Sequence, residues 1–140
     1  MRTKQVRPDK LEFEYELYIS REFDKTKDKE FIQFDFRTIK VFENFEYKIN
    51  LDSAIDTENK ILKFNIEGLS APILDISKAG PACHKFKFYE FKNVDYDLIL
   101  LKYGKNKCKF EIKISPKNIK IKSTPEKKFL EIFTEKYNVS

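Results

Sequence analysis

The chain has 140 residues, of which 41% are apolar, 15% are aromatic and 36% are charged, and its net charge is +5. This apolar content and small net charge exclude a disordered chain, and the length fits one domain spanning residues 1–140. No apolar run reaches the roughly 18 residues that a membrane-spanning helix needs, so we expect no membrane span.

The first residues, 1–9, carry charge without an apolar segment, so we interpret them as an N-terminal arm with no visible signal peptide. A cytoplasmic location is slightly favoured unless a signal was removed. Lysines outnumber arginines by 24 to 4, a bias that a genome low in G and C produces by itself. The sequence pI of about 9.0 is therefore weak support for an anionic partner.

Alternation of apolar and polar residues dominates the first half of the chain. In 11–19, five apolar residues share one face and three glutamates share the other, as a half-buried antiparallel strand requires. The stretch 32–41 alternates too, but its apolar positions shift from even to odd numbers after Phe36, which predicts a β-bulge or a tight bend. The segments 45–51 and 62–66 repeat the strand pattern.

The second half continues the same signal. The stretch 86–91 shows another slip in register, and 108–114 alternates cleanly. Leu98–Leu101 is apolar on both faces, which predicts a central strand covered on both sides. Strands spaced about 8 to 12 residues apart, with turn-rich pieces between them, favour an all-β antiparallel sandwich of about seven to nine strands.

The C-terminal segment changes period. Ser123 and Glu126 match a helix-capping pattern, with Pro125 in the first turn. Leu130 and Phe133 follow at helical spacing. We therefore predict a short C-terminal helix over residues 125–137, packed on one end or edge of the sandwich.

One stretch resembles known domains. Residues 91–115 contain Tyr96, alternating apolar residues, a turn beginning at Gly104 and a lysine-rich closing strand. This pattern is similar to the last strand pair of immunoglobulin-like and transthyretin-like sandwich domains, although Asp95 stands where their usual glycine precedes the tyrosine. The resemblance implies an immunoglobulin-like sandwich and names no activity.

Gly80, Cys83 and His84 form the most chemically suggestive cluster, because His84 is the only histidine of the chain. A thiol and an imidazole could act as nucleophile and base, but adjacent residues of a strand point to opposite faces. Cys83, His84 and Cys108 also fall short of the four ligands of structural zinc. Cys83 and Cys108 could form a disulfide only if their strands were neighbours. We expect no catalytic site, no metal and no cofactor.

Two acidic loops raise the alternative of calcium binding. The first loop alternates oxygen side chains as an EF-hand loop does, but Lys29 replaces the required glycine and interleaved lysines oppose a divalent cation. A second acidic loop could meet it at one end of the sandwich. The candidate calcium residues are Asp24, Asp28, Glu30, Asp52 and Asp56.

Charge is unevenly distributed along the chain. Residues 9–58 carry a net charge of −6, whereas residues 102–128 carry +8. Scarce arginine and inward aromatic residues argue against nucleic acid, so a partner of this lysine-rich surface would be an acidic protein or a second copy. The alternative is a solvated surface whose lysines protect an outer strand from aggregation. The predicted interaction face consists of Lys107, Lys109, Lys113, Lys120 and Lys122.

Three functional classes follow. A non-catalytic protein-interaction or structural module, such as a subunit or accessory domain of a larger assembly, fits the absence of a convergent acid, base and nucleophile set. A calcium- or small-ligand-binding sandwich that uses the acidic loops is the alternative, and an enzyme is the third. Exposed aromatic residues such as Tyr18 or Phe42 would add affinity to a charged interface.

Overall fold

The computed structural model describes residues 15–42, 48–70, 80–126 and 128–135. This part of the chain is all-β, with nine strands and no helix, as the alternation predicts for the fold class. The strands are β1 (Tyr15–Asp24), β2 (Lys29–Phe42), β3 (Lys48–Asp56), β4 (Ile61–Ser70), β5 (Gly80–Phe88), β6 (Asp95–Lys102), β7 (Asn106–Ile114), β8 (Ile119–Ser123) and β9 (Leu130–Phe133).

All nine strands belong to one sheet with the order β8-β7-β6-β4-β3-β5-β2-β1-β9. The prediction of a purely antiparallel arrangement is wrong, because β1 with β9, β3 with β5, and β4 with β6 pair in parallel. Alternation reports which face of a strand is buried, and it carries no information on the direction of the neighbouring strand. The sheet is therefore mixed.

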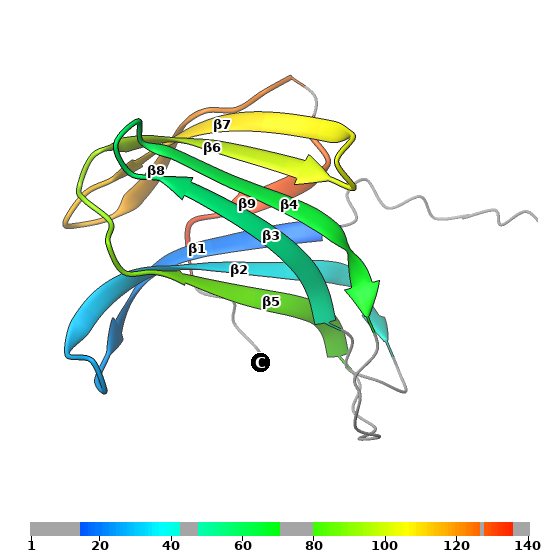
Figure 1. The fold of residues 1–140 in the computed structure, drawn as a ribbon, viewed down its shortest axis with the longest axis horizontal. Helices are drawn as coiled ribbons and strands as arrows, with labels where there is room; N and C mark the ends of the chain where they lie inside the picture. The colour runs from blue at the N-terminus through cyan, green and yellow to red at the C-terminus, as the bar shows by residue number, and fades with distance from the viewer. Residues whose placement is uncertain (1–14, 43–47, 71–79, 127, 136–140) are drawn as a thin grey trace, which may run out of the picture.

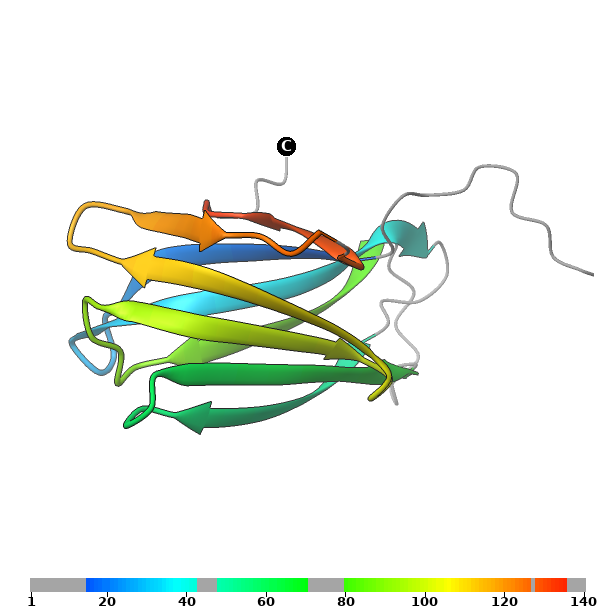
Figure 2. The same ribbon diagram turned by 90° about the horizontal axis from the view of Figure 1, so that it is seen from above.

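The sheet curls into a half-barrel, so that its two halves face each other (Figures 1 and 2). We call β8, β7, β6, β4 and β3 the upper half, and β5, β2, β1 and β9 the lower half. The halves join at one corner, where Lys48 of β3 pairs with Cys83 of β5 as the single register pair between these strands. Away from this corner, side chains rather than backbone hydrogen bonds hold the halves together.

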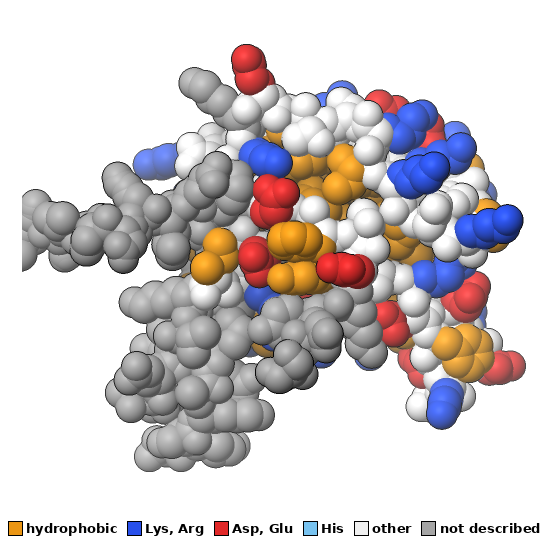
Figure 3. Space-filling model, turned by 180° about the vertical axis from the view of Figure 1, so that it is seen from behind, with side chains coloured by type: hydrophobic (Ala, Val, Ile, Leu, Met, Phe, Trp, Pro, Cys, Tyr) orange, Lys and Arg blue, Asp and Glu red, His pale blue; other side chains and the backbone are white. Residues whose placement is uncertain are grey.

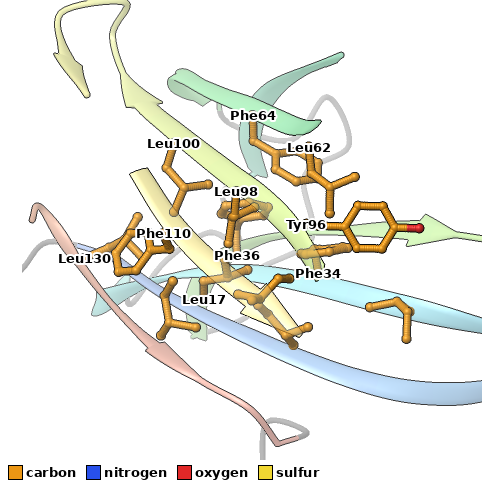
Figure 4. Close-up of a cluster of buried hydrophobic side chains, with 14 of the residues drawn as sticks. Leu17, Phe34, Phe36, Leu62, Phe64, Tyr96, Leu98, Leu100, Phe110 and Leu130 are labelled. Atoms are coloured by element: carbon orange, nitrogen blue, oxygen red, sulfur yellow. The ribbon is translucent and has the colours of Figure 1, made fainter. Parts of the chain in front are cut away.

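The core lies between the two halves (Figure 4). Phe34 and Phe36 of β2 meet Phe64 of β4 with ring centroids 5.1 and 5.3 Å apart, and all three side chains are fully buried. Phe88 of β5 meets Tyr96 of β6 in the same way, at 5.8 Å. Each fully buried side chain of this size contributes about 1.5–3 kcal/mol, so the inward register of both halves stabilises the fold.

Hydrogen bonds of Arg21 and Tyr15 in β1 also join the halves outside the apolar core. Arg21 of β1 donates from Nη2 to the backbone oxygen of Ser115 at 3.0 Å and to Oδ1 of Asn93 at 2.7 Å. The hydroxyls of Tyr15 and Tyr103 lie 2.9 Å apart. These contacts tie β1 to the loops on either side of β6 and β7, which fixes the curl of the sheet.

The two predicted register slips have different outcomes. The β2–β5 pairing shifts between Arg37 and Val41, which confirms the irregularity expected after Phe36. The slip in 86–91 is a bend, because β5 ends at Phe88 and the chain leaves the sheet there.

β6 lies between β4 and β7, as a central strand should, but the prediction that it is covered on both sides is wrong. Ile99 points outward and is half-buried, since its register partners are Lys63 on β4 and Lys109 on β7. The aliphatic stems of lysines can cover an apolar neighbour while their ammonium groups stay in water. Side-chain stems thus replace a second covering layer.

The predicted C-terminal helix over 125–137 is wrong where the structure describes it. Leu130–Phe133 forms β9, which pairs in parallel with Tyr15–Tyr18 of β1, and Ser123 ends β8 instead of capping a helix. Leu130 and Ile132 point into the core and are 0% and 8% exposed. The short stretch fits a period of two as well as a helical period, and the edge of β1 supplies partners for its backbone.

Several predicted segments lie outside the described residues. These are the N-terminal arm 1–9, the start of the first predicted strand at 11–14 and the segment 45–47. The side chain of Phe42 also lies outside them. No helix in the part of the chain that the structure describes is long and apolar enough to cross a membrane.

Candidate functional site

The five predicted lysines lie together on the outer surface of the upper half. Their strands β7 and β8 are neighbours, and Lys113 pairs directly with Lys120 in the antiparallel register. Inward positions of β7, such as Cys108 and Phe110, are buried, whereas all five lysines are exposed. The alternation in β7 thus correctly predicts the outward positions of Lys107, Lys109 and Lys113, and β8 adds Lys120 and Lys122 beside them. We call Lys107, Lys109, Lys113, Lys120 and Lys122 the lysine face.

Acidic residues of β6 neutralise part of the lysine face. Lys122 donates from Nζ to Oδ2 of Asp95 at 2.8 Å, and Lys109 Nζ lies 3.9 Å from Oδ2 of Asp97. The hydrogen bond from Lys122 lowers the pKa of Asp95, and the same bond raises the pKa of Lys122. Both pairs are well exposed, so water and salt screen them and neither contributes appreciably to stability.

The other three lysines of the face, Lys107, Lys113 and Lys120, form no ion pair with any residue in the described ranges. The lysine face therefore keeps a positive charge that can act on a partner. No aromatic side chain occupies an outward position of β7 or β8, which removes the stacking platform that a nucleic-acid strand would use.

The five candidate calcium residues are divided between two hairpins. Asp24, Asp28 and Glu30 lie in the β1–β2 hairpin, whereas Asp52 and Asp56 lie on β3. Both hairpin turns are at the same end of the molecule, but one belongs to the lower half and the other to the upper half (Figures 1 and 2). No group of three or more His, Cys, Asp or Glu side chains in the described ranges could hold a metal ion.

Three of these carboxylates stabilise their own hairpins. Asp24 Oδ1 accepts hydrogen bonds from the backbone N–H groups of Thr26 and Lys27, and its Oδ2 accepts one from the Tyr89 hydroxyl at 2.6 Å. The Tyr89 bond is the main cause that lowers the pKa of Asp24. Asp56 is bonded to the backbone and side-chain nitrogens of Asn59, which lower its pKa, and Glu30 pairs with Arg21. These contacts give the carboxylates of the acidic loops a structural role, because each carboxylate bonds to groups of its own hairpin or next to it.

Cys83 and His84 do not form a nucleophile and base pair. They are consecutive residues of β5, so their side chains point to opposite faces, as predicted. His84 Nδ1 lies 3.2 Å from the backbone oxygen of Ile49, at the corner where the two halves join. Burial lowers the pKa of His84, and nearby Lys48 lowers it further, while the bond to Ile49 opposes the shift.

Cys83 and Cys108 form no disulfide. Cys83 is on β5 of the lower half and Cys108 is on β7 of the upper half, so their strands are not neighbours. Burial raises the pKa of the Cys108 thiol. A raised pKa disfavours the thiolate, which is the reactive form of cysteine.

The structure also contains a surface that the sequence did not suggest. Outward residues of β1 and β9 place Tyr18 against Phe133, with ring centroids 4.9 Å apart and planes at 18°. In the same register, Glu16 stands beside Glu131, and Glu22 lies further along β1. We call Glu16, Tyr18, Glu22, Glu131 and Phe133 the acidic–aromatic patch. The alternation in 130–133 was the signal for it, but four residues do not distinguish a strand from a helical turn.

Comparison with family models, with curated proteins and with solved structures finds no match to this chain.

Proposed function

We propose that this protein is a non-catalytic interaction module that binds an acidic protein surface through the lysine face. The observation that carries the proposal is the arrangement of β7 and β8, which display five exposed lysines, three of them in no ion pair in the described ranges. Such a surface attracts an anionic partner and sets the rate and register of its association.

A role as a subunit or accessory domain of a larger assembly follows from the same surface. The fold is stabilised by a core between two halves of one sheet, and this leaves the outer strands to vary for recognition. The described carboxylates are committed to hairpin bonds or dispersed, so no observation favours calcium as a second candidate function. The likeness of residues 91–115 to immunoglobulin-like and transthyretin-like domains stays a prediction, and β6 and β7 span that segment.

Charge reversal tests the proposal. The variant Lys107→Glu, Lys109→Glu, Lys113→Glu should lose the proteins that the immobilised wild-type chain captures from an extract of its own cells. A matched variant, Lys25→Glu, Lys29→Glu, Lys92→Glu, makes the same change of charge at exposed positions away from the lysine face. Circular dichroism should show both variants folded, since exposed substitutions usually change stability by about 0.5 kcal/mol or less.

Retention of the captured proteins by the matched variant, together with their loss from the lysine-face variant, would support the proposal. Equal capture by all three chains would reject it. Capture of nucleic acid alone would reject the protein partner and leave the lysine face as an anion-binding surface of another kind.

A further inference from the structure

The acidic–aromatic patch lies on the outer surface of the lower half. Tyr18 and Phe133 are both half-buried, and the Tyr18 hydroxyl donates to Oε1 of Glu16 at 2.8 Å. In the view from behind, orange side chains flanked by red ones lie near the middle of the face where β1 and β9 run (Figure 3). An apolar centre with a charged rim is the usual anatomy of a protein interface.

The charged rim of this patch is acidic. Glu16 and Glu131 are direct register partners on neighbouring strands, and like charges in that position destabilise a strand pair. Lys128 lies 3.2 Å from Glu131, and Arg37 of β2 stands opposite Glu16 in the register, so cations at the border relieve part of this repulsion. The patch itself carries three carboxylates and no cation. A cationic partner would complement it.

This chain itself carries the complementary surface. The lysine face has three cations that form no ion pair in the described ranges, and it lies on the outer surface of the upper half. The lysine face belongs to β7 and β8 and the acidic–aromatic patch to β1 and β9, and β8 contacts β1 where the two halves come close (Figure 2). No ion pair in the described ranges joins the lysine face to the patch within one molecule, so the lysine face of a second molecule can supply the cations that the patch lacks.

We infer that the occupant of the acidic–aromatic patch is the lysine face of a second copy of this chain. The inference rests on the proposed function, because it identifies the acidic surface that the lysine face recognises. The contact joins two different surfaces, so each bound copy leaves one patch and one lysine face open. Such a heterologous contact continues head to tail into a ring or a filament. Tyr18 and Phe133 supply the apolar centre, and the charges set the register.

Complementation between two neutralised chains tests this geometry. The first chain carries Lys107→Gln, Lys113→Gln, Lys120→Gln, which removes only the lysines of the face that form no ion pair in the described ranges. The second chain carries Glu16→Gln and Glu131→Gln. The amide oxygen of the new glutamine at position 16 can still accept the hydrogen bond that the Tyr18 hydroxyl donates. Sedimentation velocity would follow each chain alone and their equimolar mixture, at low and at high salt.

At low salt, wild type should form a series of oligomers that grows with concentration, and each neutralised chain alone should stay monomeric. The mixture should give a one-to-one dimer and nothing larger, because only one patch and one intact lysine face remain. High salt should weaken every complex, since exposed charges are screened beyond about 8 Å at physiological ionic strength. The variant Lys25→Gln, Lys29→Gln, Lys92→Gln should associate as wild type does.

A wild-type chain that stays monomeric at every concentration overturns the inference. So does a mixture that stays monomeric or grows beyond a dimer, because a head-to-tail contact allows neither. If copies do not associate while the lysine-face variant still loses a captured acidic protein, only the second copy is rejected. If that variant also captures normally, the proposed function fails as well.

Discussion

β7 of the upper half and β2 of the lower half each lie between two other strands, but they differ in how far their outward residues are exposed to solvent. In the upper half, the outward lysines of β7 are exposed, as alternation predicts. In the lower half, the outward residues Phe31, Gln33 and Asp35 of β2 are only 5%, 7% and 2% exposed. β2 lies between β1 and β5, and rings such as Tyr89 pack over its outward face. Burial of an outward residue therefore depends on its neighbours as much as on its own register.

This difference changes the electrostatics of the two halves. Asp35 Oδ2 accepts from Nε of Arg37 at 3.0 Å, while Asp35 Oδ1 is buried with no hydrogen-bond partner. Burial raises the pKa of Asp35, and the Arg37 guanidinium opposes that shift. In the upper half, Asp95 and Lys122 form their pair in solvent, and the pKa of Asp95 is lowered. Breaking the buried pair of Asp35 and Arg37 should therefore destabilise the fold, whereas breaking the exposed pair of Asp95 and Lys122 should have little effect on stability.

The core shared by both halves should give the largest effect. Phe64 contacts the rings of Phe34, Phe36 and Phe86, so Phe64→Ala should lower the free energy of unfolding by about 3–5 kcal/mol. Denaturant unfolding followed by circular dichroism measures this loss, with Phe23→Ala as the control because Phe23 is 54% exposed. Similar losses in both variants would contradict a core between the halves.

The second-largest effect should come from breaking the buried ion pair between Asp35 and Arg37 in the lower half. Arg37→Met removes the guanidinium that pairs with the buried Asp35 carboxylate and leaves it only the charge of Lys85, so the substitution should cost about 3 kcal/mol at neutral pH. The loss should shrink in acid, because the raised pKa of Asp35 lets the folded variant take up a proton before the unfolded chain does. Urea unfolding at neutral and acidic pH checks both points.

The double variant Asp35→Leu, Arg37→Met is the matched control for that pair. It removes both charges, so it should recover most of the stability that Arg37→Met loses. A single variant that unfolds like wild type at neutral pH would show instead that the pair is solvated and that the two halves do not differ.

The corner between the halves should respond to pH. Burial keeps the pKa of His84 below its ordinary value of 6.5, so the unfolded chain binds this proton more tightly than the folded one. Stability contributed by neutral His84 should therefore be complete above that value and decrease as pH falls through it. His84→Gln should lack this decrease in urea titrations at neutral and mildly acidic pH. Parallel pH profiles of the two chains would show that His84 is solvated.

The exposed pair of the upper half should give the smallest effect. Lys122→Met removes the partner of Asp95 and should leave the free energy of unfolding almost unchanged, because water and salt screen an exposed pair. The comparison with Arg37→Met uses the same new side chain in both halves. A loss as large as that of Arg37→Met would mean that the outer surface of β8 is buried in solution, as self-association would make it.

The sequence predicts inward and outward positions well where alternation is long. The residues of β7 lie in an uninterrupted alternation of strand length, and the slip after Phe36 is visible because alternation continues on both sides of it. Sheet order and strand direction were not predictable, because pairings such as β4 with β6 join distant segments through contacts that no local pattern encodes. Of the candidate surfaces, the lysine face followed from register, whereas the acidic–aromatic patch depends on β9, which was expected to be a helix.

The pairing of β1 with β9 also bears on the order of folding. β1 is the first described strand and β9 is the last, so Tyr15 meets Leu130 across almost the whole chain. Contacts between such distant residues slow folding, because a long loop must close before the pairing stabilises anything. A chain emerging from the ribosome can form the β1–β2 and β6–β7 hairpins early. The outer edge of β1 stays unpaired until β9 has been synthesised. During that time a chaperone or a second nascent chain could bind to this edge.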